Sequence, residues 1–440
     1  MVALQKYKNK KIAIYGMGMT GCSVAKNFKK LKAKIYCWDD NIRKRNEVKK
    51  FKIPLNKFWL HPEPMDYIVI SPGIDIEKCK IKKYLNKNLG KIMTDLDLFF
   101  ELNKSSLIIS ITGTNGKSTT CKIIEKILKT AGNNVKTLGN IGNPVLSFHR
   151  SKKKHVFILE ISSYQLQYSK IFRSKHAAIL NITPDHLERH KSINNYIKIK
   201  SKIFFAQKTS DYSYLNLKNK YSYLIKNILK KKKIKSNLTF IKESNCNFLL
   251  KKINNQHFKS KGNIENLAFA YKIAKNLRIS DEIVIRAINN FKALEHRQEV
   301  IFSKNKIICI NDSKATSFDA SLQSLSNYNN IYWIVGGRPK LKDKFYLRNI
   351  KKNIKKAYII GKNIKFFKRE IKNDVLFTIS QNLKNAIDDI FNDIKNRKNE
   401  KITILLSPAA ASFDQFKNFE ERGNDFRNLI SKKFKRYLYV

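Results

Sequence analysis

Short runs of apolar, mostly β-branched residues recur along the chain, and stretches with helical spacing of apolar positions separate them. Near the N-terminus these runs occupy Lys11–Tyr15, Lys34–Trp38 and Tyr67–Ile70. Each run ends at small or polar residues, which predicts a strand followed by a loop. Strands that alternate with helices form parallel sheets, and such sheets bind ligands at the carboxyl ends of their strands.

The same alternation continues over the rest of the chain. The stretch 211–260 is the exception, because it is rich in Lys and Asn and its weak alternation predicts no definite element. The other runs predict a second and a third α/β unit. They are Leu107–Thr112, Val156–Ile161 and Ala177–Asn181 in the second unit, and Ile307–Ile310, Ile331–Val335, Ala357–Ile360 and Ile402–Leu406 in the third.

A chain of 440 residues is too long for one ordinary core. We expect an α/β protein of three domains, 1–100, 101–296 and 297–440, each with a mostly parallel sheet flanked by helices. No apolar stretch reaches the length of a membrane span, and the polar N-terminus is not a secretory signal, so we expect a cytoplasmic protein. The six cysteines form no C-x-x-C pair, which argues against zinc and disulfides.

The formal net charge is +55, which could suggest a nucleic-acid partner. The positive residues are mainly lysines spread along the whole chain, a mixture typical of proteins from AT-rich genomes. Specific nucleic-acid binders instead gather Arg and aromatic residues on one face. We therefore expect no nucleic-acid partner, and we interpret the densest run, Lys230–Lys235, as a solvated loop or helix face.

The most informative motif follows the predicted strand Leu107–Thr112 and precedes a helix-spaced apolar run. A glycine-rich turn between a strand and a helix directs backbone N–H groups and the helix dipole at a phosphate. Lys117 would add charge near the terminal phosphates, and Ser118 or Thr119 would offer a hydroxyl to Mg²⁺. Ile111 stands where the strict pattern has glycine, and a plain turn is the alternative. The motif reads Gly113, Thr114, Asn115, Gly116, Lys117, Ser118, Thr119.

Gly16, Gly18 and Gly21 follow the first predicted strand, and Asp39 ends the second. This spacing fits a dinucleotide fingerprint, in which the glycines admit a pyrophosphate and the carboxylate contacts a ribose or base. The motif is weak when taken alone. A tight turn without a ligand, a nicotinamide cofactor and a UDP-sugar all remain compatible with it.

Three further groups suggest chemistry at strand ends. Glu160 ends an apolar strand and is placed to hold Mg²⁺. His186 could be a metal ligand, a general base or a core histidine. The alternation of lysines with apolar residues in Tyr196–Phe204 indicates a charged helix face or edge and distinguishes no single lysine. In the last third, Arg297 could contact a phosphate and Asp312 a ribose or base.

Taken together and in chain order, these motifs resemble the Mur ligase family, whose phosphate loop is the variant found here. The final segment resembles most the family member that adds D-glutamate. The resemblance covers nearly the whole chain. It is carried by Gly16–Gly21, Ser71–Gly73, Thr112–Thr119, Gly139–Gly142, Glu160–Leu166, Thr183–His186, His296-Arg297, Asn311–Thr316, Ser407–Phe419 and Arg422-Gly423.

The resemblance implies a Rossmann-like UDP-substrate domain, a central P-loop-type ATPase domain and a Rossmann-like amino-acid domain. It implies an ATP-dependent amide ligase that adds D-glutamate to UDP-N-acetylmuramoyl-L-alanine through an acyl phosphate, with Mg²⁺, for peptidoglycan precursors. Lys117, Glu160, His186 and Lys200 would be catalytic, and Lys200 would be carbamylated. Mg²⁺, two ions in all, would be held by Ser118, Glu160, His186 and the Lys200 carbamate.

The remaining implied contacts fall into three groups. ATP would contact the phosphate loop Gly113–Thr119 together with Asn266, Arg297 and Asp312. The UDP-substrate would contact Thr20, Asp39, Ser71, Gly73, Asn140 and Ser162. D-glutamate would contact Thr316, Lys340, Ser412 and Phe419, and we expect the protein to be a monomer.

The sequence also departs from the family pattern. Gly262–Asn266 lacks the histidine that often begins the adenine-contacting helix, and Lys342 stands close enough to Lys340 to compete for its role. The alternatives are a sister ligase that adds another amino acid and a nicotinamide-dependent oxidoreductase built on Gly16–Gly21. The oxidoreductase interpretation leaves the Lys117 loop and the C-terminal segment without a role.

Overall fold

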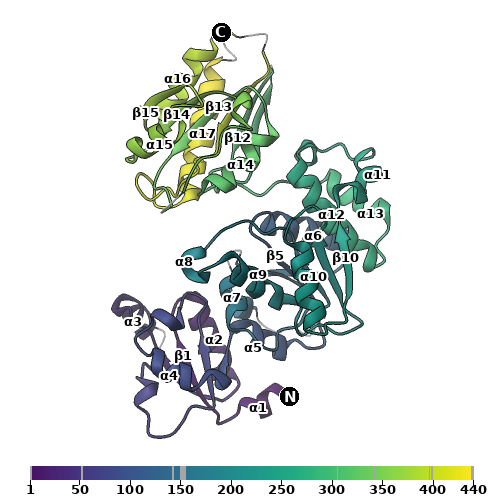
Figure 1. Ribbon diagram of the computed structural model, residues 1–440, viewed down its shortest axis with the longest axis vertical. Coiled ribbons are helices and arrows are strands. Elements are labelled where there is room, and N and C mark those ends of the chain that lie inside the picture. The colour runs from purple at the N-terminus through teal and green to yellow at the C-terminus, as the bar shows by residue number, and fades with distance from the viewer. Residues whose placement is uncertain are drawn as a thin grey trace. The chain divides into compact units, whose positions relative to one another are not determined.

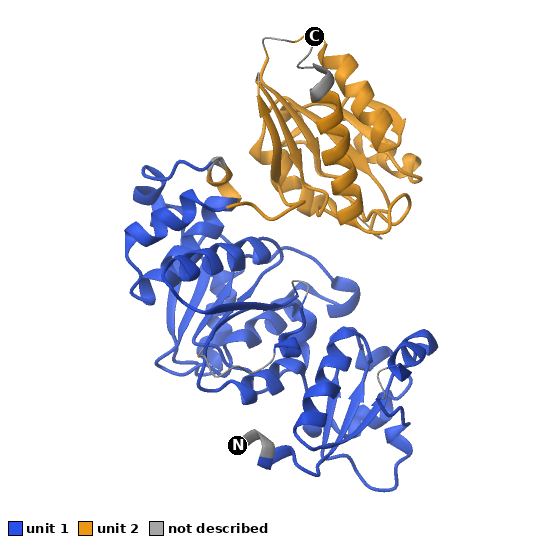
Figure 2. Cartoon of the chain, turned by 180° about the vertical axis from the view of Figure 1, so that it is seen from behind, with its two compact units in different colours: residues 1–255, 263–291 blue, residues 256–262, 292–440 orange. Residues whose placement is uncertain are grey.

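The computed structural model describes residues 2–50, 53–140, 143–148, 155–304, 306–340, 343–395, 397 and 400–437. The chain divides into two compact units, residues 1–255 with 263–291, and residues 256–262 with 292–440 (Figure 2). Unit 1 contains two sheets and unit 2 contains one, and helices flank each sheet (Figure 1). The α/β fold class is confirmed, while the domain boundary near residue 100 stays a prediction.

The first sheet has four parallel strands in the order β2-β1-β3-β4. All three strands predicted for this region are confirmed, and β4 escaped prediction because it is only two residues long. The strands are β1 Lys11–Tyr15, β2 Lys34–Trp38, β3 Tyr67–Ile70 and β4 Ile92–Met93, and the helices are α1 Val2–Tyr7, α2 Met19–Lys30, α3 Ile42–Lys49, α4 Lys82–Lys87 and α5 Asp95–Leu102.

The second sheet has six parallel strands in the order β10-β9-β8-β5-β7-β6, with β5 in its interior. The strands are β5 Leu107–Thr112, β6 Val135–Gly139, β7 Val156–Glu160, β8 His176–Ile179, β9 Tyr212–Asn216 and β10 Asn237–Ile241. The helices are α6 Lys117–Thr130, α7 Ser163–Gln167, α8 Leu187–His190, α9 Ile193–Ser201, α10 Ser222–Lys231, α11 Asn247–Leu250, α12 Lys261–Asn276 and α13 Asp281–Asn289.

Two strands of this sheet, β9 and β10, and two helices, α10 and α11, fall in the stretch 211–260, where the sequence predicted no definite element. The strand β9 buries a polar residue, Ser213, whose hydroxyl donates to Gln207 Oε1 at 2.6 Å. The strand β10 is an edge strand that is only partly buried. Both features weaken the apolar signal on which strand prediction rests. The charged run Lys230–Lys235 begins in the last turn of α10, as expected of a helix face that continues into a loop.

The third sheet has six strands in the order β11-β12-β16-β13-β14-β15, and only the β11–β12 pair is antiparallel. Alternate residues of β13 enter two cores, Trp333 on one face and Tyr332 on the other. The strands are β11 Glu299–Lys304, β12 Ile307–Asn311, β13 Ile331–Gly336, β14 Ile354–Ile360, β15 Phe377–Gln381 and β16 Ile402–Leu406. The helices are α14 Phe318–Asn327, α15 Ile364–Ile371, α16 Leu383–Ile394 and α17 Phe419–Tyr437.

Two expectations from the sequence concern the state of the cysteines and the presence of membrane-spanning helices. All six cysteines are free, and four of them are buried, as expected of small reduced residues. In the part of the chain that the structure describes, no helix combines the length and the apolarity needed to cross a membrane.

A buried carboxylate joins α5 to the segment after α7. Asp97 is 1% exposed, and its Oδ1 accepts hydrogen bonds from Ser169 Oγ at 2.8 Å and from the N–H groups of Lys170, Ile171 and Phe172 at 3.0, 2.9 and 3.1 Å. Its Oδ2 accepts from the Thr94 N–H at 3.0 Å at the start of α5. One side chain therefore satisfies donors from two separate parts of unit 1.

Replacing Asp97 with Ala is expected to lower the free energy of unfolding by about 3 kcal/mol, because several buried donors lose their acceptor. Asp97→Asn keeps one carbonyl oxygen and should cost less. Urea unfolding measures both variants. The control is Glu47→Ala, which removes an exposed ion pair with Lys44 and should change stability by less than about 0.5 kcal/mol. Equal stability of Asp97→Ala and wild type would contradict this role.

Candidate active site

The phosphate loop has the geometry that the sequence predicts. It connects β5, inside the second sheet, to α6, whose N-cap is Gly116 at φ +83°. A Cβ at Gly116 would lie 2.4 Å from Asn266 Oδ1, so this position needs glycine both for its backbone conformation and for space. Thr120 Oγ1, in the first turn of α6, donates to the same Asn266 oxygen at 3.1 Å and so connects α12 to α6.

Two lysines converge on one carbonyl of this loop. Lys117 Nζ donates to Gly113 O at 2.9 Å and to Thr114 O at 2.7 Å. Lys200 Nζ donates to the same Gly113 oxygen at 3.0 Å and to Thr112 Oγ1 at 3.3 Å. The Lys200 amine also lies over the Tyr196 ring, 4.8 Å from its centroid. The structure thus places both lysines at the carboxyl end of β5.

Burial holds the pKa of the Lys200 amine well below its usual value, and the charge of Lys117 lowers it further. Lys200 is 2% exposed, whereas Lys198 on the same helix is exposed. The Lys202 amine is bound elsewhere, by the carbonyl oxygens of Gln167 at 2.6 Å and Ser169 at 3.2 Å. The fold therefore distinguishes three lysines that sequence spacing leaves equivalent.

A chain of side-chain hydrogen bonds crosses the ends of three adjacent strands. Ser118 Oγ, after β5, donates to Glu160 Oε2 at 2.6 Å, and Asn140 Nδ2, after β6, donates to Glu160 Oε1 at 3.0 Å. Glu160 ends β7 and is 1% exposed. Hydroxyl and carboxylate oxygens are ligands that suit Mg²⁺, which usually takes one or two carboxylates and completes its shell with water and phosphate.

This donor set fits a nucleotide-bound Mg²⁺ better than a cage built by the protein alone. Among the described residues, no three His, Cys, Asp or Glu side chains cluster closely enough to hold a metal. A Mg²⁺ ion at Ser118 and Glu160 would therefore complete its shell with oxygen ligands from water and phosphate.

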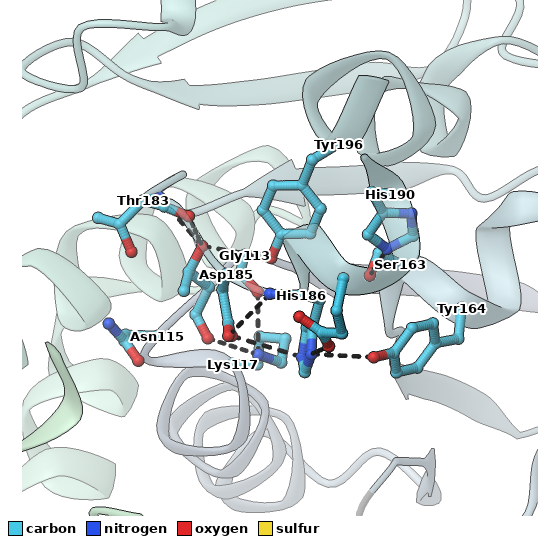
Figure 3. A network of polar contacts seen from close by, with 12 residues as sticks. Gly113, Asn115, Lys117, Ser163, Tyr164, Thr183, Asp185, His186, His190 and Tyr196 are labelled. Carbon is cyan, nitrogen blue, oxygen red and sulfur yellow. Dashed lines mark hydrogen bonds and ion pairs between the residues drawn. The ribbon is translucent and has the colours of Figure 1, made fainter. Parts of the chain in front are cut away.

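His186 lies at a loop corner rather than in the core. Its φ is +54°, its ring bonds to the Tyr164 hydroxyl through Nδ1 at 2.9 Å, and Asp185 Oδ2 is 3.4 Å from its Nε2. Figure 3 shows His186 between Tyr164 and Asp185, with Lys117 close by. The side chain is 35% exposed, which excludes the core-histidine interpretation. The metal-ligand and general-base roles both remain compatible with this position.

The segment around His186 also contains a second histidine, which the sequence reasoning missed. His190 is fully buried between the rings of Tyr164 and Tyr196, and its Nε2 bonds to Ser163 Oγ at 2.9 Å (Figure 3). Burial lowers its pKa to about 4, so its ring is neutral near pH 7. No spacing signal distinguishes such a residue from any other histidine, because its environment comes from three separate segments.

Asn181 is another residue whose role sequence reasoning missed. Its Oδ1 accepts from the Asn115 N–H at 2.8 Å, and its Nδ2 donates to Asn115 O at 3.1 Å. Thr114 Oγ1 accepts from the Thr183 N–H at 3.1 Å. These contacts attach the loop after β8 to the phosphate loop, so the two predicted motifs form one structural site.

Two of the predicted UDP-substrate residues of the first sheet, Ser71 and Asp39, bond to the Gly16 turn. Ser71 Oγ donates to Gly16 O at 2.5 Å, and a Cβ at Gly21 would lie 2.0 Å from that same oxygen. The Asp39 carboxylate accepts from the N–H groups of Met17 at 2.6 Å and Asn41 at 2.8 Å. Thr20 and Ser162 are partly exposed and Gly73 is exposed. Their ligand contacts stay predictions.

The predicted residues of the third sheet lie in unit 2. The buried Asp312 carboxylate accepts from Ser324 Oγ at 2.5 Å and Ser407 Oγ at 2.9 Å, and burial raises its pKa to about 6. Ser412 is buried, while Lys340 is exposed and Arg297, Thr316 and Phe419 are partly exposed. Lys314 Nζ lies 3.5 Å from the centroid of the Phe419 ring. Lys342, like Ile141 and Gly142, lies outside the described residues.

Comparison with known proteins shows which family this chain belongs to. Residues 111–283 match the family model of the Mur ligase middle domain, and residues 10–92 match that of the MurD-like N-terminal domain of Mur ligases. A UDP-N-acetylmuramoylalanine–D-glutamate ligase from Rickettsia prowazekii (strain Madrid E) is 37% identical, over 97% of this chain and 99% of its own. The chain belongs to the Mur ligase family. The resemblance inferred from the motifs is therefore confirmed.

More distant relatives agree with this assignment. A ligase of the same name from Thermoanaerobacter sp. (strain X514) is 31% identical, over 96% of this chain and 98% of its own. Among solved structures, MurF from Acinetobacter baumannii has a TM-score of 0.57 at 15% identity, covering 90% of this chain and 91% of its own. At that identity the likeness establishes the fold alone. None of these findings supports the nicotinamide-dependent oxidoreductase.

Replacing Lys200 with Met is expected to raise the free energy of unfolding near neutral pH. The difference from the wild type should become smaller as the pH rises. The pKa of Lys200 in the folded protein lies below the usual lysine value of 10.5. Between these two pKa values the unfolded chain binds more protons than the folded chain, so the stability of the wild type rises with pH.

Urea unfolding in carbon dioxide-free buffer from about pH 7 to about pH 10 measures this difference. Lys198→Met, at an exposed position of the same helix, reports the effect of the substitution itself. A stability difference between Lys200→Met and wild type that stays constant over this range would contradict the prediction.

Proposed function

We propose that this protein is an ATP-dependent ligase that joins D-glutamate to UDP-N-acetylmuramoyl-L-alanine during synthesis of peptidoglycan precursors. The observation that carries the proposal is the 37% identity, over 97% of the chain, with a ligase named for these substrates. The phosphate loop of unit 1, with Lys117, Ser118 and Glu160, supplies a site for ATP. We further propose that the protein acts in the cytoplasm as a monomer.

The chemistry explains why a phosphate loop belongs in an amide ligase. A carboxylate resists attack by an amine until one of its oxygens becomes a leaving group. Transfer of the γ-phosphoryl group of ATP to the substrate carboxylate gives an acyl phosphate and ADP. The D-glutamate amine then attacks the acyl carbon, and the tetrahedral intermediate loses phosphate to leave the amide.

Lys117 would stabilise the charge that moves with the phosphoryl group. Its amine rests on the carbonyls of Gly113 and Thr114, so it is already held at the loop before a nucleotide binds. Exchange of one carbonyl for a phosphate oxygen would aim the same charge at the transferred group. The buried Asn266 and the backbone N–H groups of Gly113–Thr119 would complete the ATP contacts in unit 1.

Mg²⁺ would be held by Ser118 and Glu160, with His186 and a carbamate on Lys200 as further ligands, and would neutralise charge on the phosphates. Carbamylation needs a neutral amine, because the nitrogen lone pair attacks the carbon of CO₂ and the nitrogen then releases a proton. The lowered pKa of Lys200 favours this neutral form at neutral pH. Thr112 and Gly113, which accept the Lys200 hydrogen bonds, would keep its nitrogen at the loop.

The other substrates would bind at the remaining strand ends. UDP-N-acetylmuramoyl-L-alanine would contact Thr20, Asp39, Ser71, Gly73, Asn140 and Ser162. Arg297 and Asp312 of unit 2 would contact ATP, and D-glutamate would contact Thr316, Lys340, Ser412 and Phe419.

The purified protein is expected to release phosphate from ATP only when UDP-N-acetylmuramoyl-L-alanine and D-glutamate are both present. The acyl phosphate needs the first substrate, and its breakdown to phosphate and amide needs the second. A coupled phosphate assay with each component omitted in turn measures this dependence. Release with neither substrate, or none with both, counts against the proposal.

The same assay separates this function from that of a sister ligase. Replacement of D-glutamate by L-alanine, a diamino acid or a dipeptide should reduce turnover to background. Turnover that is higher with one of these than with D-glutamate would assign the protein to another branch of the family.

Lys200→Ala is expected to lose activity, and added short carboxylates such as acetate should restore part of it by supplying the oxygens of the missing carbamate. Lys202→Ala, which changes an amine bound to other carbonyls, is the matched control. Initial rates with and without acetate measure the rescue. An active Lys200→Ala variant that does not respond to carboxylates would refute the carbamate.

A further inference from the structure

Arg422 is a buried cation that is not among the predicted catalytic, metal-binding or substrate-binding residues. It lies in the first turns of α17 and is 1% exposed. Its Nε donates to Ser313 Oγ at 3.0 Å, and its Nη2 donates to the carbonyl oxygens of Ser313 at 2.9 Å and Ala410 at 3.0 Å. Within the described residues, no carboxylate forms an ion pair with it. Burial lowers its pKa, and the charge of Asp414 opposes this lowering.

The guanidinium bonds to the loops that follow two neighbouring strands and lies beside the loop that follows a third. The strands β12, β16 and β13 are adjacent and parallel, so their carboxyl ends meet at one edge of the sheet. Ser313 follows β12 and Ala410 follows β16. Gly337 follows β13, and a Cβ at that glycine would lie 3.3 Å from Arg422 Nη1.

Each of these loops carries a residue expected to contact D-glutamate. Thr316 follows Ser313 by three positions, Ser412 follows Ala410 by two and Lys340 follows Gly337 by three. The fourth residue, Phe419, is connected through its backbone, because Ser313 Oγ donates to Phe419 O at 2.8 Å. Arg422 thus bonds to two of the four segments of the predicted amino-acid site, lies beside a third, and is linked to Phe419 through Ser313.

We propose that Arg422 is a positioning residue, whose guanidinium holds these segments at the spacing that D-glutamate binding requires. The inference rests on the proposed function and deepens it. Arginine suits this task because its planar fork presents several donors in fixed directions, whereas a lysine amine is a single flexible point. Its three acceptors lie on the loops after β12 and β16, and they require donors that point in different, fixed directions.

Steady-state kinetics of Arg422→Lys test the proposal, because lysine keeps the charge and loses the fork. The KM for D-glutamate is expected to rise about tenfold or more, as loss of hydrogen bonds to a charged group predicts. The KM values for ATP and for the UDP-substrate should stay within about twofold of the wild type. Arg427→Lys is the matched control on the same helix, where the arginine binds the Glu299 carboxylate at 2.7 Å.

A wild-type KM for D-glutamate in Arg422→Lys overturns the proposal, and so does an equal rise in all three KM values. If Arg422→Lys does not fold, Ser313→Ala decides. It removes the hydroxyl that joins Arg422 to Phe419 and should raise the same KM selectively, whereas an unchanged KM overturns the role of Arg422. The wild type is measured first. A lack of D-glutamate-dependent turnover there contradicts the proposed function itself, not the positioning role.

Discussion

The burial of positive charge at the carboxyl end of β5 is the constraint on which the central site depends. Two amines share the carbonyl oxygen of Gly113, and the Lys200 amine has almost no contact with water. A buried ammonium is costly unless an anion compensates it, and a backbone carbonyl compensates only in part. The amine can escape this cost by losing its proton. Burial therefore favours the neutral form of the Lys200 amine, which lies beside the phosphate loop.

The parallel sheet explains why the other groups gather at the same place. The strands β5, β7 and β6 are neighbours, so the residues that end or follow them meet at one edge. Ser118, Glu160 and Asn140 consequently form one hydrogen-bonded chain although they come from separate parts of the sequence. Gly139 permits this approach, since a Cβ there would lie 2.2 Å from the Glu160 backbone oxygen. The third sheet repeats this arrangement with β12, β16 and β13 around Arg422.

Much of this could be predicted from the sequence, because the strands that carry the motifs are short, apolar and bounded by glycine or polar residues. The phosphate loop and the position of Glu160 at a strand end followed from such local patterns. The burial of Lys200 did not, since it depends on which residue of α9 reaches Thr112 and Gly113 at the end of β5 in the folded chain. The pairing of His186 with Tyr164 and the double contact of Asn181 with Asn115 also depend on loops that only the folded chain brings together.

Burial penalises the positive charge of both Lys200 and Arg422. The two residues respond differently, because an arginine keeps its proton more strongly than a lysine does. Burial lowers the pKa of Arg422 only to about 10, so its guanidinium stays charged at neutral pH, with three hydrogen bonds to neutral acceptors. The amine of Lys200 starts from a lower pKa and stands beside a second cation, so it can give up its proton. A permanent cation suits a residue that holds loops in place. An amine that can lose its proton suits the carbamylation proposed for Lys200.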